Sequence, residues 1–364
     1  SLKTHMIRYF LALATGLILA PSTFAQLTFE FQGEERSYYL AAPDPVPEGA
    51  PLVFVLHGYT SSAALIRAYS GWPNLAEQEG FVAVFPQGTP DQVGISHWNA
   101  NLGISSTNDH GFLVALAEQL QETYGLSADC TYSCGMSNGG FMSYSLACEH
   151  PDVFKAVGSV TGAMSAADMG CIPNEVVPIV HLHGTQDQVV SYDNGVGGSW
   201  GSAGVEDIMD HWTDLMGTTL VDEVTLPNQE VEDATSVDFF RHYGSPGGQE
   251  FHHYRVNGGG HDWFGVWGSM DIVSTQVMWD FFSSQCAGEF TGMTEPNAPE
   301  PWLHWRGNGI STDRTCHVDL FDATGRCMEQ QSLIRGQIWS PVTKGFTIIR
   351  ATDAAGHQQI LKTL

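Results

Sequence analysis

The segment Gly135-Met136-Ser137-Asn138-Gly139 carries the most informative pattern in the sequence. A short strand pattern (residues 130–134, CTYSC) precedes it, and a helical pattern begins at Gly139. In a strand-to-helix turn of this kind, the serine is strained so that its hydroxyl is exposed above a sheet, and the flanking glycines let strand and helix approach closely. The pattern predicts that Ser137 is a nucleophile.

Alternating strand and helix patterns surround this turn. Helical spacing is clear at 108–125, which ends at Gly125, and a last helix is expected over Ser269–Gln285. The order predicts an α/β architecture over 26–287, with a mostly parallel sheet and helices on both faces. A continuous apolar run typical of a strand buried on both faces lies at 52–58 (LVFVLHG), and further strands are predicted at 81–88 (FVAVFPQG), 156–162 (AVGSVTG) and 177–184 (VPIVHLHG).

Two partners for the serine follow it in the order Ser, Asp, His. Asp187 comes directly after an apolar strand, where a carboxylate is well placed to accept from a histidine. Asp193, a few residues later, is the competing acid. His261 follows three glycines, and a serine hydroxyl needs such a base to take its proton. We predict a triad of Ser137, Asp187 and His261.

The other histidines near these motifs have different expected roles. His181 and His183 lie on a buried strand pattern and are expected in the core, whereas His252 and His253 lie in a later strand pattern and are expected to be structural.

The dipeptide His57-Gly58 ends the first apolar run, at the position where this kind of fold places one amide of an oxyanion hole. We assign the hole to the backbone N–H groups of Tyr59 and Asn138. These elements together predict the α/β-hydrolase fold.

Composition excludes several classes of partner. The chain has 14 Lys and Arg against 40 Asp and Glu, a formal net charge of -26. Nucleic acids and anionic membrane surfaces attract basic patches, so neither is expected to bind. No metal cluster or cofactor motif is apparent, and we expect no metal and no cofactor.

The first 25 residues have the pattern of an export signal. A basic residue and an apolar run over 10–20 (FLALATGLILA) precede the small-residue site at Thr23-Phe24-Ala25. The run is too short to span a bilayer. We expect cleavage after Ala25, secretion of the chain, and no stable membrane insertion.

Seven cysteines in an exported chain predict disulfides. Cys130 and Cys134 lie on one strand pattern, about 13 Å apart, and cannot bridge each other. We predict a Cys148–Cys171 disulfide.

The pattern changes after the catalytic region. Residues 288–301 (GEFTGMTEPNAPEP) are rich in Gly, Pro and small polar residues and are predicted to be a linker. Residues 302–364 contain strand and turn patterns without a helix, so we predict a small all-β domain there.

Three stretches resemble the polyhydroxybutyrate depolymerase and feruloyl esterase family: GMSNGGFMSYSLACEHPDVFKAVGSVTG, HLHGTQDQVVSY and GGGHDWFG followed by MWDFF. The resemblance covers roughly 27–286 and implies a cofactor-free esterase whose triad is Ser137, Asp187 and His261. The family's Trp-Asn pair corresponds to Trp98-Asn99, and its Asp ahead of a Gly-Phe corresponds to Asp109. Tyr59 stands where members often have Cys, which implies an altered acyl pocket.

The last domain, including HVDLFDATGRCMEQQ and GFTIIRATDAAGHQQILKTL, resembles the C-terminal sorting domain of type IX secretion. This resemblance implies contact with an outer-membrane export machinery. The alternative is a substrate-binding β module.

Four aromatic residues lie near the motifs and are candidates for binding substrate. Tyr59, Trp98, Trp263 and Phe264 are predicted to form an apolar surface for a polymeric or aromatic ester, although core packing is the alternative. The hypothesis is a secreted serine esterase acting on polyhydroxyalkanoate-type polyesters or on feruloyl or acetyl esters of plant polysaccharide. A secreted serine peptidase of the same fold and a catalytically inactive binding protein remain alternatives.

Overall fold

The computed structural model describes residues 26–193 and 201–286, and a set of strands between 303 and 363. The expected signal peptide (1–25) and linker (288–301) lie outside the described residues. The domain boundaries derived from them therefore remain predictions.

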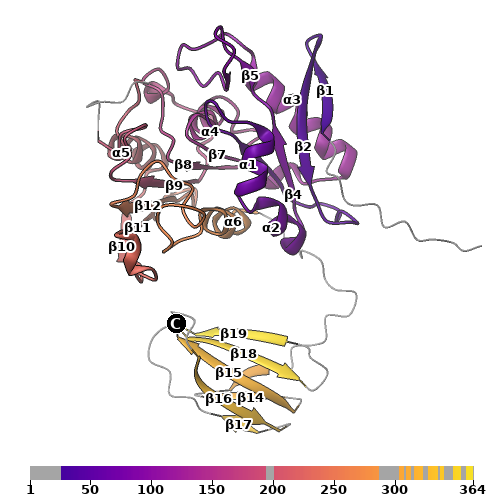
Figure 1. The fold of residues 1–364 in the computed structure, drawn as a ribbon, viewed down its shortest axis with the longest axis vertical. Coiled ribbons are helices and arrows are strands. Elements are labelled where there is room, and N and C mark those ends of the chain that lie inside the picture. The colour runs from indigo at the N-terminus through magenta and orange to yellow at the C-terminus, as the bar shows by residue number, and fades with distance from the viewer. Residues whose placement is uncertain are drawn as a thin grey trace, which may run out of the picture.

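A ten-stranded sheet forms the centre of the main domain, in the order β1-β2-β4-β3-β7-β8-β9-β12-β11-β10 (Figure 1). The six strands from β4 to β12 in that order are mutually parallel, and the strands at both edges are antiparallel. This confirms the expected mostly parallel sheet. The strands are Leu27–Phe31 (β1), Glu34–Ala41 (β2), Leu52–Leu56 (β3), Val82–Pro86 (β4), Thr131–Met136 (β7), Ala156–Val160 (β8), Ile179–Gly184 (β9), Leu220–Thr225 (β10), Ser236–Tyr243 (β11) and Phe251–Asn257 (β12).

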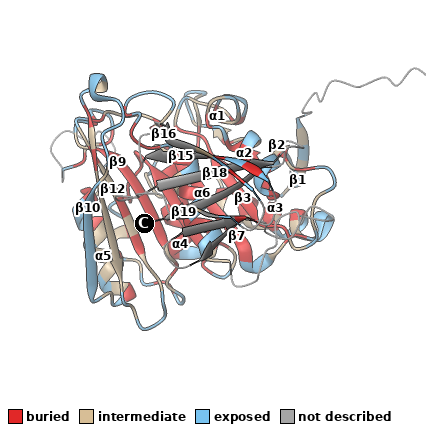
Figure 2. Cartoon of the chain, turned by 90° about the horizontal axis from the view of Figure 1, so that it is seen from below, coloured by how far each residue is buried: buried red, intermediate tan, exposed pale blue. Residues whose placement is uncertain are grey.

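Helices cover both faces of the sheet because side chains of each central strand alternate between two apolar clusters. In β3, Phe54 belongs to the cluster that contains buried residues of α3, α4 and α5, and Val55 belongs to the cluster that contains buried residues of α1, α2 and α6. Figure 2 shows these central strands as buried and β10 at the edge as exposed. The helices are Ala63–Tyr69 (α1), Trp72–Glu79 (α2), Asp109–Tyr124 (α3), Asn138–Glu149 (α4), Val205–Met216 (α5) and Ser274–Ser284 (α6), with short 3-10 turns at Ala128–Cys130, Asp168–Gly170 and Val231–Asp233. Thr89–Pro90 (β5) and Ser96–His97 (β6) form a small separate hairpin.

The last helix begins later than the sequence pattern predicts. It was expected from Ser269, but α6 starts at Ser274. Val273 is extended, with φ -112° and ψ 106°, and the N–H groups of Met270 and Ser274 donate to Asp233 and to the carbonyl of Phe264 instead of to a preceding helical turn. The residues after His261 therefore form a loop, and the helix starts only beyond it.

The strands described after residue 302 pair only with one another. They form a three-stranded sheet (β13-β14-β17) and a four-stranded sheet (β16-β15-β18-β19), as expected for an all-β segment. The strands are Leu303–Arg306 (β13), Gly309–Thr312 (β14), Cys316–Asp322 (β15), Cys327–Leu333 (β16), Ile338–Trp339 (β17), Thr347–Asp353 (β18) and Gln358–Thr363 (β19).

Two disulfides join distant elements of the main domain. Cys148–Cys171 confirms the predicted pair, and Cys130–Cys286, which was not predicted, joins the start of β7 to the end of α6. Cys130 and Cys134 do not bridge each other, as predicted, and Cys134 is buried and unbridged. None of the helices in the described residues is long and apolar enough to cross a membrane.

The two disulfides predict different losses of stability. Cys130–Cys286 closes 156 residues and Cys148–Cys171 closes 23. Replacing the first pair by serine is expected to lower the free energy of unfolding by about 2–5 kcal/mol. Replacing the second pair should cost about 1.7 kcal/mol less, because the loop-closure entropy grows with the logarithm of loop length. Denaturant unfolding of the two double variants measures both losses, and an equal or reversed order would contradict the prediction.

Candidate active site

Ser137 lies in the sharp turn between β7 and α4. Its backbone has φ 54° and ψ -121°, a conformation that non-glycine residues adopt rarely and at a cost. The N–H of Ser137 donates to the carbonyl of Val160 at 2.9 Å, and the N–H of Phe141 donates to the carbonyl of Ser137 at 3.0 Å. These two hydrogen bonds connect the backbone of Ser137 to the end of β8 and to the first turn of α4.

Glycines make this turn sterically possible. A Cβ at Gly139 would collide with the carbonyl oxygen of Leu56 at the end of β3, and a Cβ at Gly135 would lie 2.5 Å from the backbone carbon of Gly139. A Cβ at Gly162 would lie 2.6 Å from the carbonyl oxygen of Ser137. The two glycines of the G-x-S-x-G motif are thus required by close contact of α4 with β3 and β7.

Asp187 and His261 are directly hydrogen bonded. The Nδ1 of His261 lies 2.7 Å from Oδ2 of Asp187, and the carboxylate is fully buried while the imidazole is 19% exposed. Asp193, the competing acid, is an exposed residue at the end of its described segment. The contact with His261 therefore favours Asp187 over Asp193 as the predicted acid.

The carboxylate of Asp187 is held by several donors. Its Oδ1 accepts from the backbone N–H groups of Val189 (2.7 Å) and Val190 (2.9 Å), and Nε2 of His183 lies 3.4 Å from Oδ2. Burial favours the neutral form, but the hydrogen bonds from His183 and His261 outweigh burial and hold the pKa of Asp187 well below its usual range. Asp187 is therefore a carboxylate at any pH near neutrality.

His183 belongs to a buried row of side chains behind Asp187. The Tyr144 hydroxyl lies 2.7 Å from Nδ1 of His181, and Nε2 of His181 lies 3.1 Å from Nδ1 of His183. Burial lowers the pKa of His181 well below its usual range, so this ring is neutral. His181 and His183 are buried, as expected for core histidines, and His253 is buried as well. The contact of His183 with Asp187 was not anticipated.

Strand order brings these residues to one edge of the sheet. Ser137, Asp187 and His261 follow β7, β9 and β12, whose parallel carboxyl ends lie at the same edge. A small pocket at this edge lies between Ser137 and the loop that contains Asp187. It is lined by Tyr59, Leu102, Ser137, Asn138, Phe141 and Val190.

The proposed oxyanion donors come from the start of α4 and from the turn after β3. Asn138 is the first residue of α4, so its N–H has no acceptor within the helix and lies at the positive end of the helix dipole. Tyr59 lies in the turn after β3, and its hydroxyl donates to Asp91 at 2.7 Å. Both residues line the pocket with Ser137.

His57 fixes the peptide group that contains the N–H of Tyr59. The N–H of Gly88 donates to Nε2 of His57 at 3.0 Å, which leaves Nδ1 to donate to the carbonyl of Gly58 at 2.8 Å. Burial lowers the pKa of His57 to about 4, so the ring is neutral. Because the Gly58 carbonyl and the Tyr59 N–H share one peptide plane, this bond also sets the direction of the N–H.

Three of the four aromatic residues expected to bind substrate are core residues instead. Trp98, Trp263 and Phe264 have no exposed surface, so their side chains offer no face to a substrate. Trp263 packs edge-on against Tyr69 and donates to Thr275 at 3.2 Å. Of the four, only Tyr59 lines the pocket, and the apolar lining by Leu102, Phe141 and Val190 was missed. Of these three residues, only Val190 could have been predicted to lie near the site from the local sequence, because it follows Asp187 by three residues.

No group of three or more His, Cys, Asp or Glu side chains that could hold a metal ion is present in the part of the chain that the structure describes.

The sheet order, the strained serine turn and the Asp187–His261 pair define the class: this is a protein of the α/β-hydrolase fold. Residues 36–196 match the family model described as esterase PHB depolymerase.

Several curated proteins are similar to the chain. They include a bifunctional acetylxylan esterase/xylanase of Neocallimastix patriciarum (26% identical; 74% of this chain and 37% of the relative), a probable feruloyl esterase C of Aspergillus niger (30%; 44% and 58%) and a poly(3-hydroxybutyrate) depolymerase of Ralstonia pickettii (31%; 38% and 31%). The chain thus spans between 31% and 58% of the length of these relatives. Among solved structures, an acetyl xylan esterase from Aspergillus awamori matches with a TM-score of 0.49 at 15% identity, over 68% of this chain and 94% of that one.

Replacing the buried acid tests the selection of Asp187 over Asp193. Asp187→Asn removes the carboxylate that orients His261 and should lower kcat by about 10⁴-fold. Asp193→Asn makes the same chemical change at an exposed site and should leave kcat within about twofold. Steady-state kinetics on a p-nitrophenyl ester measures both, and a larger loss in the Asp193 variant would contradict the assignment.

Proposed function

We propose that this chain is a serine carboxylic ester hydrolase that works through an acyl-enzyme on Ser137. The observation that carries the proposal is the 2.7 Å contact between Asp187 and His261 at the sheet edge where the strained Ser137 turn also ends. A strained nucleophile, a base and a buried carboxylate in this strand order support acyl transfer.

The chemistry follows from the roles of these groups. His261 takes the proton of the Ser137 hydroxyl as its oxygen attacks the ester carbonyl, and the N–H groups of Tyr59 and Asn138 stabilise the oxyanion. The tetrahedral intermediate collapses, the alcohol leaves with the proton held by His261, and an acyl-serine ester remains. A water molecule, deprotonated by His261, then releases the acid and restores the serine.

The substrate class is proposed as polymer-linked esters, either polyhydroxyalkanoate-type polyester or feruloyl or acetyl esters of plant polysaccharide. The printed names of the relatives include acetylxylan esterase, feruloyl esterase and poly(3-hydroxybutyrate) depolymerase. The apolar lining by Leu102, Phe141 and Val190 beside the nucleophile suits an uncharged acyl group. Tyr59 is proposed as the residue that contacts the substrate as well as supplying an amide.

Two other functions compete with this proposal. A serine peptidase would use the same triad, and turnover of amides in excess of esters would favour it. A catalytically inactive binding protein would not need the strained serine conformation, whose cost is usually retained for function.

Export is proposed from independent features. The signal-like residues 1–25 and the two disulfides fit an oxidising compartment. Residues 302–364 are proposed either to engage a type IX secretion machinery or to bind polymer.

Product release by the chain starting at Gln26 tests the function. The chain should release acid from methyl ferulate, acetylated xylan or a polyhydroxybutyrate suspension, and Ser137→Ala should lower kcat by about 10⁴–10⁶-fold. The preferred substrate identifies the acyl group. Equal turnover by the wild type and Ser137→Ala, or no turnover of any ester, would contradict the proposal.

A further inference from the structure

The Trp98-Asn99 pair takes no part in the acyl-transfer chemistry, and neither does Asp109. Trp98 is nevertheless fully buried, and it is hydrogen bonded both to the start of α4 and to His57 ahead of the turn that contains Tyr59. Its backbone is hydrogen bonded to the side chain of Asn138, and its indole ring is hydrogen bonded to the carbonyl of His57.

The backbone of Trp98 is paired with the side chain of Asn138. The Trp98 N–H donates to Oδ1 of Asn138 at 2.6 Å, and Nδ2 of Asn138 donates to the Trp98 carbonyl at 3.1 Å. Two parallel bonds between one amide side chain and one residue's backbone fix both in orientation. They therefore fix the first residue of α4, whose own N–H is the proposed oxyanion donor.

The indole ring of Trp98 contacts the segment that carries the other proposed donor, the N–H of Tyr59. Its Nε1–H donates to the carbonyl of His57 at 3.0 Å, and the two rings lie 5.1 Å apart. His57 in turn donates to the carbonyl of Gly58, in the peptide that supplies the N–H of Tyr59. Trp98 is thus hydrogen bonded to Asn138, which carries one proposed oxyanion donor, and to His57, which orients the other.

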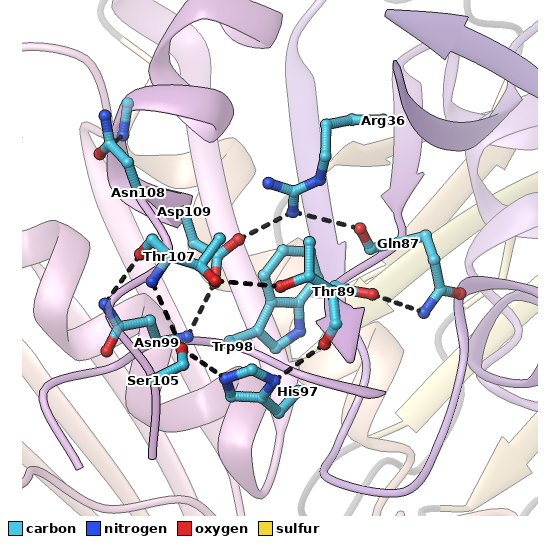
Figure 3. Close-up of polar contacts among 12 residues, drawn as sticks. Arg36, Gln87, Thr89, His97, Trp98, Asn99, Ser105, Thr107, Asn108 and Asp109 are labelled. Atoms are coloured by element: carbon cyan, nitrogen blue, oxygen red, sulfur yellow. Dashed lines mark hydrogen bonds and ion pairs between the residues drawn. The ribbon is translucent and has the colours of Figure 1, made fainter. Parts of the chain in front are cut away.

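A buried ion pair anchors the Trp98 segment (Figure 3). Oδ2 of Asp109 accepts from the N–H of Asn99 at 2.8 Å, and Oδ1 accepts from the Arg36 guanidinium at 2.7 Å. The side chains of Asp109 and Arg36 are 0% and 5% exposed, so both charges are largely shielded from water and depend on each other. The pair connects the Trp98 segment to β2 and to the first turn of α3.

We propose that Trp98 is a positioning residue that sets the separation of the two oxyanion donors, and that the Arg36–Asp109 pair holds it in place. This inference rests on the proposed ester hydrolysis. A hydrogen bond to the oxyanion strengthens as charge develops in the transition state, so misplaced donors lower kcat and leave KM nearly unchanged. The Asp187–His261 contact is not altered, so the pH profile keeps its shape.

The test compares Trp98→Phe with Trp212→Phe on p-nitrophenyl acetate. Both change a fully buried tryptophan, and the indole N–H of Trp212 donates to the Met164 sulfur, away from the oxyanion loops. Trp98→Phe should lower kcat at least about tenfold, toward the 10²-fold loss typical of a missing oxyanion donor. KM should change by less than about threefold, and the limbs of the pH profile should not move. Trp212→Phe should stay within about twofold in kcat.

Rates are normalised to the fraction of Ser137 that reacts to completion with a fluorophosphonate, which separates lost positioning from lost folded enzyme. Asn138→Ala provides a second variant, since it removes both bonds to the Trp98 backbone and leaves the indole intact. Asn138→Ala should show the same fall in normalised kcat. If Trp98→Phe does not fold, the normalised kcat of Asn138→Ala is the test of the inference. Unchanged normalised kcat, a loss that lies in KM, or an equal loss in Trp212→Phe would overturn the inference. No turnover by the wild type would instead overturn the proposed function.

Discussion

The left-handed backbone of Ser137 constrains much of the structure around it. With φ at 54°, the chain must reverse between β7 and α4 within one residue, and this brings the first turn of α4 against the end of β3. Only glycine fits at 139, because any Cβ would collide with the Leu56 carbonyl. Ser137 and Asn138, on either side of the point where the strand ends and the helix begins, both line the pocket. The cost of the backbone conformation is offset by hydrogen bonds from β8 and α4.

The parallel sheet supplies the remaining geometry. Residues that lie more than 120 positions apart in the chain, Ser137 and His261, follow strands whose carboxyl ends share one edge. Asp187 is fixed twice, by the backbone of its own loop and by the buried His183. The two proposed oxyanion donors are also fixed by hydrogen bonds from buried residues, namely the neutral His57 and Trp98. The acid and the proposed oxyanion hole therefore both depend on buried aromatic residues behind the pocket.

The sequence predicted some of these features much better than others. The serine turn was predictable because its glycines are a local steric requirement, and Asp187 and His261 were predictable because each follows a recognisable strand or glycine run. The positions of Trp98 and Trp263 were not, because whether an aromatic ring near a motif faces the pocket or the core depends on elements distant in sequence. Trp98 is buried by contacts with His57 and Asn138, which lie about 40 residues away on either side. The Cys130–Cys286 disulfide was missed for the same reason, since its partners are brought together only by the packing of α6 on the sheet.

The most direct test of the account is the site of the covalent intermediate. The chain is incubated with a fluorophosphonate, digested, and analysed by tandem mass spectrometry, with His261→Ala treated in parallel. We predict a single adduct on Ser137 in the wild type, formed far more slowly in the His261 variant. An adduct on another residue, or no adduct at all, would contradict the assignment of Ser137 as the nucleophile.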